Sequence, residues 1–165
     1  PQHEDLDAVA AFLADEVATR YIGGSMPRAL AWRSLATMRG SWELQGFAMF
    51  SVIEKDSGRW VGRVGPWKPE GWPGTEVGWS IVRERWGRGY APEAAAVCID
   101  WAFATLGWEQ VIHTIDPDNA GSRTVAAKLG SRFLRMGALP EPHHERAVEI
   151  WGQSRAQWAG REAAA

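Results

Sequence analysis

Cysteine is nearly absent from this sequence, since Cys98 is the only one among 165 residues. A lone cysteine forms no internal disulfide, and Cys98 falls within a helical pattern, so we expect a packing role and a reducing compartment. Long apolar runs are missing as well, because no stretch of about 18 apolar residues is present to cross a membrane. The chain also does not open on a signal-peptide pattern. These absences predict a cytoplasmic protein with no membrane partner.

An excess of basic residues is also missing. Lysine and arginine number 18 against 20 aspartate and glutamate residues, for a net charge of -2, and basic side chains gather only over residues 83–88. This balance provides no electrostatic surface for nucleic acid, so we predict no nucleic-acid partner. Histidine is scarce too, and His143 and His144 lack a third ligand at metal-binding spacing, so we predict no metal. The length suits one packed domain over residues 1–165.

Glycine and tryptophan, by contrast, are abundant, with 18 and 11 residues. The segment 82–95 joins an apolar run to a predicted helix and contains Gly87 and Gly89. These glycines let the backbone turn tightly and expose successive N–H groups, and the helix that follows begins with unpaired amides directed at the turn. With Arg88 beside them, the segment predicts a phosphate site. For this segment alone, a glycine-rich connection with solvated arginines is the open alternative.

Apolar periodicity divides the chain into helices and strands. We predict helices over residues 4–14, 25–40, 91–106 and 119–129. We predict strands over residues 47–53, 60–64, 76–82, 108–115, 131–136 and 148–152, and a frayed tail over 159–165. The Pro- and Trp-rich stretch 66–74 is predicted as a loop, because proline cannot donate to a central sheet ladder. The strand, helix and strand over 76–115 predict a parallel crossover.

Asn119 and Ser122 form a second polar pair. They stand three residues apart in the first turn of the predicted helix 119–129, so they share one face. Both are expected near the C-terminal edge of the sheet, where α/β folds place ligands. Helix capping is the alternative, because both residue types are favoured at helix starts. Together with the glycine-rich turn, this pair suits a long ligand with phosphates at one end and a reactive group at the other.

These motifs together resemble the GNAT superfamily of N-acetyltransferases, and most of all its branch of ribosomal-protein N-terminal acetyltransferases. The residues that carry the resemblance are Trp86-Gly87-Arg88-Gly89-Tyr90-Ala91-Pro92-Glu93-Ala94, preceded by Glu76-Val77-Gly78-Trp79 and followed by Asn119-Ala120-Gly121-Ser122 and Lys128-Leu129-Gly130. Gly89 and Ala91 occupy the last two fixed places of the family's loop. Trp86 stands where Gln or Arg is commonest in the superfamily, and where this branch often carries Trp.

The resemblance implies an α/β (α+β) acyl-CoA N-acyltransferase fold, with a mixed, mainly antiparallel sheet of six or seven strands and helices on both faces. Acetyl-CoA, the implied acetyl donor, would bind where the strands ending at Val82 and Ile115 splay apart. The family's first strand normally precedes the first helix, and nothing before Glu4 supplies it. We therefore expect either that this strand was trimmed or that the sheet lacks an edge strand.

The implied activity is acetyl-CoA-dependent N-acetylation of a primary amine, on a protein N-terminus or a small molecule, by direct attack on the thioester. The acting species would be a monomer or a homodimer. The implied cofactor-binding residues are Ile81, Val82, Arg83, Trp86, Gly87, Arg88, Gly89, Tyr90 and Ala91, together with Asn119 and Ser122. The loop amides would hold the pyrophosphate, and the backbone at the end of the preceding strand would pair with pantetheine. A non-catalytic sensor that binds acyl-CoA is the alternative function.

Catalysis in such enzymes requires positioning and two proton movements. Ser122 is implied as the proton donor to the leaving sulfur, and Asn119 would orient pantetheine or a water on the substrate side. For the base that deprotonates the acceptor, two alternatives stay open. One is Glu76 at the start of its strand, and the other is a loop that contains His143, His144 and Glu145.

The tryptophans offer an aromatic acceptor site. Trp32, Trp67 and Trp72 lie in the second predicted helix and in the Pro- and Trp-rich loop, regions that border the acceptor cleft in similar enzymes. We therefore expect these three side chains, with His143 and His144, to line the substrate site. Such a site suits a peptide N-terminus and a small aromatic amine equally.

Overall fold

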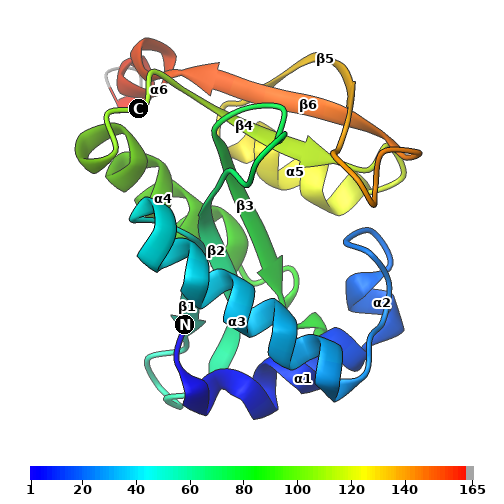
Figure 1. Cartoon of the computed structure of the whole chain (residues 1–165). Coiled ribbons are helices and arrows are strands. Elements are labelled where there is room, and N and C mark those ends of the chain that lie inside the picture. The colour runs from blue at the N-terminus through cyan, green and yellow to red at the C-terminus, as the bar shows by residue number, and fades with distance from the viewer. Residues whose placement is uncertain (163–165) are drawn as a thin grey trace.

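The computed structural model describes residues 1–162, which form a six-stranded sheet with helices on both faces (Figure 1). The strands are β1 (Phe50–Ile53), β2 (Trp60–Trp67), β3 (Glu76–Ile81), β4 (Gln110–Ile115), β5 (Arg132–Ala138) and β6 (Ala147–Ser154). The helices are α1 (Leu6–Ala14), α2 (Glu16–Thr19), α3 (Arg28–Gln45), α4 (Tyr90–Thr105), α5 (Ala120–Lys128) and α6 (Arg155–Glu162), with 3-10 turns η1 (His3–Asp5) and η2 (Arg83–Arg85). This architecture confirms the predicted fold class. Within the described part of the chain, no helix has the length and apolar character needed to cross a membrane.

The sheet is antiparallel except at its centre, in the order β1-β2-β3-β4-β6-β5. β3 and β4 run parallel and pair at one position, Glu76 opposite Ile112, before they diverge (Figure 1). Beyond this position, side chains connect the two strands in place of backbone hydrogen bonds. Glu76 Oε1 accepts from the Thr114 N–H at 3.0 Å, and His113 Nδ1 bonds to Val77 O at 2.7 Å. The predicted parallel crossover through α4 is confirmed, and the sheet opens toward the C-terminal ends of these strands.

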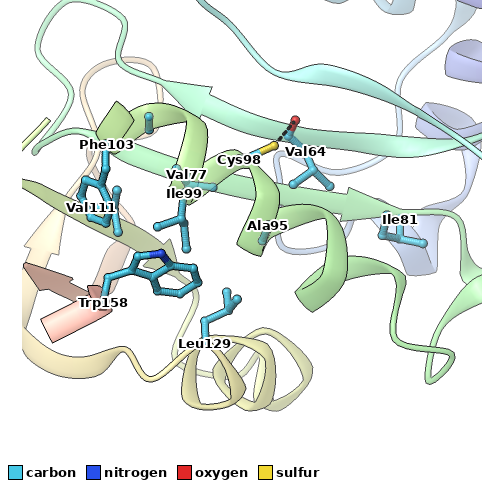
Figure 2. Close-up of a cluster of buried hydrophobic side chains, with 11 residues drawn as sticks. Val64, Val77, Ile81, Ala95, Cys98, Ile99, Phe103, Val111, Leu129 and Trp158 are labelled. Atoms are coloured by element: carbon cyan, nitrogen blue, oxygen red, sulfur yellow. Dashed lines mark hydrogen bonds between the residues drawn. The ribbon is translucent and has the colours of Figure 1, made fainter. Parts of the chain in front are cut away.

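The larger core lies between α4 and strands β2 and β3 (Figure 2). The face of α4 that packs on the sheet buries Ala95, Cys98, Ile99, Ala102 and Phe103. The two alanines are fully buried, and their small side chains let the helix lie close to the strands. Cys98 is buried in this core with its Sγ 3.7 Å from Val64 O, and burial raises the pKa of its thiol to about 12. The thiol therefore stays protonated and unreactive, as a packing role requires.

The opposite face of the sheet is covered by α1 and α3, which share a second core (Figure 1). Its buried side chains are Val9, Ala10, Phe12, Leu13, Ala31 and Leu35. α2 follows α1 directly, because the Asp15 side chain accepts hydrogen bonds from the N–H groups of Val17 and Ala18 and so caps its start. No sequence pattern predicts α2, since four residues are too few to show helical periodicity.

Several predicted boundaries are wrong. α3 does not end at Gly40 but continues to Gln45, where Gly46 at φ 77° closes it, and Trp42 in the added turn packs on Phe50 at 5.0 Å between ring centroids. β1 accordingly begins at Phe50 rather than at residue 47. The predicted frayed tail is wrong over residues 159–162, which belong to α6, and residues 163–165 lie outside the described residues.

Pro66 lies inside β2, so the predicted loop over 66–74 is wrong at its start. Hydrogen bonding alternates along a strand, and Val61 O accepts from the Val82 N–H on the β3 side. Pro66, five positions further, therefore directs its backbone nitrogen toward β1. β1 begins at Phe50, opposite Val64, and so does not reach Pro66, whose missing N–H therefore removes no ladder bond. Proline fits this central strand because the neighbouring strand does not extend that far.

Candidate functional site

Two connected clefts open where β3 and β4 diverge. The sheet cleft, of about 380 Å³, includes in its lining Ser34, Arg63, Trp67, Trp72, Glu76 and Thr114. The loop cleft, of about 460 Å³, includes Trp86, Gly87, Gly89, Tyr90 and Ala91. Six residues line both clefts, namely Tyr21, Ile22, Trp79, Ser80, Asn119 and Ser122. A ligand can therefore run from the glycine-rich loop, past Trp79 and Ser122, to the sheet.

The loop before α4 has the geometry of an anion site. Gly87 and Gly89 adopt φ values of 74° and 87°, and a Cβ added to either would meet no atom within 4 Å. Open space therefore lies in front of both glycines. Gly89 is the N-cap of α4 and places no side chain over the first turn, so the amides of that turn are left for a ligand. Oriented amides and the positive end of a helix dipole are the groups that hold a pyrophosphate. The loop cleft thus fits the phosphate end of acetyl-CoA.

The arginines of this segment do not act as one cluster. Arg83 Nε pairs with Asp15 Oδ2 at 3.2 Å and lies outside both clefts, so it is not placed to bind a ligand there. Arg85 forms a two-bond ion pair with Glu54, at 2.7 and 3.0 Å, and this guanidinium is the main reason that the pKa of the Glu54 carboxyl lies far below its usual range. Arg88 makes no ion pair within residues 1–162, although it does not line the loop cleft itself. Of these three arginines, Arg88 alone has a charge that is not paired with a carboxylate of residues 1–162 and is therefore available to a phosphate.

The end of β3 presents different backbone groups from those predicted. The Val82 N–H donates to Val61 O at 2.9 Å, so this amide belongs to the sheet and is not available to pantetheine. Because the ladder alternates, Trp79 and Ile81 direct their backbone groups away from β2, toward the gap beside β4. Ile81 O already accepts from Trp86 Nε1 at 2.7 Å, which ties the loop to the strand. The backbone of Trp79, with the N–H of Ile81, replaces Val82 as the candidate partner of pantetheine.

Asn119 and Ser122 lie at the junction of the clefts, as their shared helix face predicts. Asn119 is also the N-cap of α5, because its Oδ1 accepts from the Ser122 N–H at 3.0 Å. The Ser122 hydroxyl has a different partner, since Trp79 Nε1 donates to Ser122 Oγ at 3.3 Å. Capping therefore belongs to the Asn119 side chain and the Ser122 backbone, and the Ser122 hydroxyl is left for the ligand.

Glu76 is a buried carboxyl on the wall of the sheet cleft, with 5% of its surface exposed. Its oxygens accept from the Thr114 N–H and Oγ1, both at 3.0 Å, and from Trp72 Nε1. Burial outweighs these hydrogen bonds and raises the pKa of the carboxyl to about 7. A carboxyl with this pKa exchanges its proton near neutral pH.

His113 is a second buried titratable group, and sequence reasoning missed it. Nδ1 carries the proton because Val77 O, 2.7 Å away, can only accept. Nε2 therefore accepts from the Ser131 hydroxyl at 2.9 Å, and Gln153 Nε2 donates to the same hydroxyl at 2.9 Å. Burial lowers the pKa of His113 to about 4, so the ring is neutral at physiological pH. A single histidine in an apolar strand gives no periodic or spacing signal that would have revealed it.

The predicted acceptor residues divide into two groups. Trp67 and Trp72 line the sheet cleft with their rings edge-to-face and centroids 6.3 Å apart, and His143 lines it too. Trp32 is 53% exposed on α3 and lines neither cleft, so its assignment to the acceptor site is wrong. His144 also lies outside both clefts, because the loop directs only its neighbour inward.

Residues 1–132 match the acetyltransferase (GNAT) domain family. YkkB of Bacillus subtilis (strain 168) is 33% identical over 92 residues, which cover 54% of this chain and 54% of YkkB, so the match spans about half of that relative's length. An acetyltransferase from Agrobacterium tumefaciens str. C58 has a TM-score of 0.82 at 24% identity, over 94% of this chain and 88% of that one. The ribosomal-protein-S5-alanine acetyltransferase from Vibrio fischeri has a TM-score of 0.71 at 18% identity, over 96% and 92% of the two chains.

The two solved structures share the fold, and the family match covers the glycine-rich loop and the start of α5 that together form the loop cleft. Enzymes of this family use acetyl-CoA as the acetyl donor, and a relative of similar fold from Mycobacterium smegmatis is described in complex with CoA-disulfide. The predicted fold and family are therefore confirmed. With 132 matched residues and a loop that fits the donor's phosphates, this chain belongs to the GNAT family of acetyltransferases.

Proposed function

We propose that this chain acetylates a primary amine held in the sheet cleft, while acetyl-CoA lies in the loop cleft. The observation that carries the proposal is the buried carboxyl of Glu76, in the cleft that joins the donor's cleft at Trp79 and Ser122. With a pKa raised to about 7 by burial, Glu76 can take a proton from an acceptor ammonium at neutral pH. Glu76 is thus the general base, in preference to His143.

Each proton movement has a side chain to perform it. Acetyl-CoA, when bound, supplies the thioester carbonyl that the amine attacks. Glu76 takes one proton from the acceptor ammonium before the attack. As the new C–N bond forms and the C–S bond breaks, Ser122 Oγ gives its O–H proton to the leaving sulfur and is reprotonated by the second proton that the acceptor nitrogen then loses. Ser122 Oγ accepts from Trp79 Nε1, which leaves its own O–H free to donate. Asn119 holds the first turn of α5 and thereby sets the position of Ser122.

The acceptor is a primary amine of a protein N-terminus or of a small molecule. Trp67 and Trp72 form an aromatic edge to the sheet cleft, and Trp72 also donates to Glu76 Oε2. An apolar part of the acceptor next to its amine would pack on these rings. Both acceptor classes satisfy this requirement, so the choice between them rests on experiment.

A panel assay tests the proposal. The full chain is incubated with acetyl-CoA and peptides, amino acids or polyamines, and both free thiol and the mass of the acceptor are followed. We expect thiol release matched by an acetylated amine for at least one acceptor class. CoA binding by calorimetry without acetylation of any member would support the acyl-CoA sensor instead and would overturn the proposal.

A further inference from the structure

Arg63 carries a charge that nothing in the described protein balances. Its Nη1 donates to Ser34 Oγ at 3.1 Å, but its Nε is buried without a hydrogen-bond partner. Arg63 also makes no ion pair with any carboxylate of residues 1–162. Burial lowers the pKa of its guanidinium to about 10, so the group is still charged at neutral pH. A buried charge without a counterion is unfavourable, and an anion from outside would relieve it.

The sheet register places the Arg63 charge in the sheet cleft, on the same face as Glu76. Arg63 lies opposite Ser80, and Trp67 lies opposite Glu76, so these four side chains share one face of the sheet. The Arg63 and Ser80 pair stands four positions from the Trp67 and Glu76 pair, which is about 13 Å along the strands. All four line the sheet cleft, so a ligand in it can reach both the Glu76 carboxyl and the Arg63 guanidinium.

Two serine hydroxyls stand beside Arg63 on the cleft wall. Ser34 of α3 accepts from the guanidinium, Ser80 of β3 lies opposite Arg63 in the sheet, and both line the same cleft as Arg63. An oxyanion needs this combination of a guanidinium and neutral hydrogen-bond donors. Arg146 also lines the cleft, but it comes from the loop between β5 and β6, and Asp116 contributes a negative charge to the lining. Arg63 is partly buried between the sheet and α3, whereas Arg146 is exposed.

We infer that the acceptor carries an oxyanion, a carboxylate or a phosphate, which the Arg63 guanidinium binds while the amine of the same molecule lies at Glu76. The inference rests on the proposed function, and it narrows the acceptors to amines that also bear an acid group. Arg63 is thus a specificity-determining residue, and Trp67 and Trp72 contact the part of the acceptor between its two charged ends.

The test uses acceptors that differ only at the end remote from the amine. Amines of several chain lengths, ending in a carboxylate, a phosphate, an alcohol or an amide, are titrated calorimetrically into the CoA-loaded full chain and assayed with acetyl-CoA. The variants are Arg63→Gln and Arg63→Lys, with Arg59→Gln as the control. Arg59 is an exposed arginine directly before β2, the strand that contains Arg63, and it lies outside both clefts.

We expect the wild-type protein to prefer acid-bearing acceptors. Arg63→Gln should weaken their binding by about 10- to 100-fold, the range expected for a lost charge-assisted hydrogen bond, and leave the alcohols nearly unchanged. Arg63→Lys should retain part of the preference because it keeps the charge, and it replaces the glutamine variant if that variant does not fold. Arg59→Gln should match the wild type, and the carboxylate and phosphate arms identify which anion is bound.

Equal weakening of charged and neutral acceptors, or no wild-type preference for an acid group, would overturn the inference. A failure of the proposed function has a different signature, since no amine would be acetylated at all. In that case the calorimetric comparison of acids with alcohols still decides whether Arg63 binds an anion. Acetylation of neutral amines without an acid preference would leave the proposed function intact and remove only the role of Arg63.

Discussion

Glu76 is the proposed general base, so the reaction should depend directly on its carboxylate. Glu76→Gln keeps the size of the side chain and an acceptor for the Thr114 N–H, but it removes the base. We expect kcat to fall by about 10²- to 10⁴-fold with CoA affinity unchanged. In the wild type, kcat/KM should fall about tenfold per pH unit below the Glu76 pKa of about 7, because the base is then protonated, and level off above it.

Steady-state kinetics from acid to neutral pH and CoA calorimetry measure these effects. The exposed Glu70, in the loop before β3, provides the matched control, and Glu70→Gln should retain the wild-type rate and pH profile. A Glu76→Gln variant with a normal rate, or with the wild-type acid limb, would assign the base to another group.

Ser122 is proposed for a chemical role, as proton donor, whereas Asn119 has a structural role as the N-cap of α5. Variants of the two residues distinguish these roles. Ser122→Ala retains the backbone N–H that Asn119 Oδ1 caps, so we expect little change in stability or CoA affinity. The single-turnover rate should fall by about 10- to 1000-fold if the hydroxyl protonates the leaving sulfur. Asn119→Ala should instead lower the free energy of unfolding by about 1 kcal/mol through the lost cap. Denaturant melts and rapid-mixing kinetics on both variants decide, and a normal rate in Ser122→Ala removes this residue from the chemistry.

The glycine-rich loop and the first turn of α4 form one proposed phosphate site, in which backbone N–H groups contact the ligand. Gly89→Glu would place a carboxylate in the open space before the loop, where the phosphates of CoA are expected. We expect calorimetry to show no CoA binding by the folded variant, because like charges would meet in that space. Gly107→Glu is the control for strain, since Gly107 also has a positive φ of 66° and open surroundings but lies outside both clefts. Normal CoA affinity in Gly89→Glu, or equal loss in Gly107→Glu, would disprove the loop assignment.

At the scale of the whole molecule, the pH dependence of stability is set in part by two buried groups, His113 and Glu76, whose pKa values are shifted in opposite directions. The His113 pKa is lowered from 6.5 to about 4, so between these values the unfolded chain binds a proton that the folded chain does not, and stability rises with pH. The Glu76 pKa is raised from 4.5 to about 7, so there the folded chain holds the extra proton and stability falls as pH rises. Over the shared window the two contributions cancel.

Glu76→Gln should therefore uncover the contribution of His113. Relative to the wild type, we expect the free energy of unfolding of this variant to rise by about 1.4 kcal/mol per pH unit across the shared window, from 4.5, the ordinary pKa of Glu76, to 6.5, the ordinary pKa of His113. Chemical melts at a series of pH values measure it. Parallel curves for the two proteins across this range would show that Glu76 is not protonated in the folded state.

Local patterns were sufficient for the order of the six strands and of the longer helices α1, α3, α4 and α5, but not for α2, α6 or all of the element ends. The periodic helices, the strand before the glycine-rich loop and the crossover through α4 follow from side-chain spacing, which is a property of neighbouring residues. The predictions at Pro66 and Gly40 were wrong because both depend on residues distant in the chain. Whether a strand tolerates proline depends on where its neighbour begins, here β1 at Phe50, and the end of α3 depends on the packing of Trp42 on Phe50. Local chemistry cannot report either contact.

The sequence by itself determined the family, and it predicted the phosphate site at the glycine-rich loop and the pairing of Asn119 with Ser122, because each depends on residues close together in the chain. Only the tertiary structure decided that Glu76 is buried in the sheet cleft, that His113 is neutral, and that Arg63 lacks a counterion among residues 1–162. The physical reason is that burial and charge pairing are set by groups far apart in sequence. Thr114 and Trp72 surround Glu76, and α3 covers Arg63, so their chemistry exists only once the sheet has assembled.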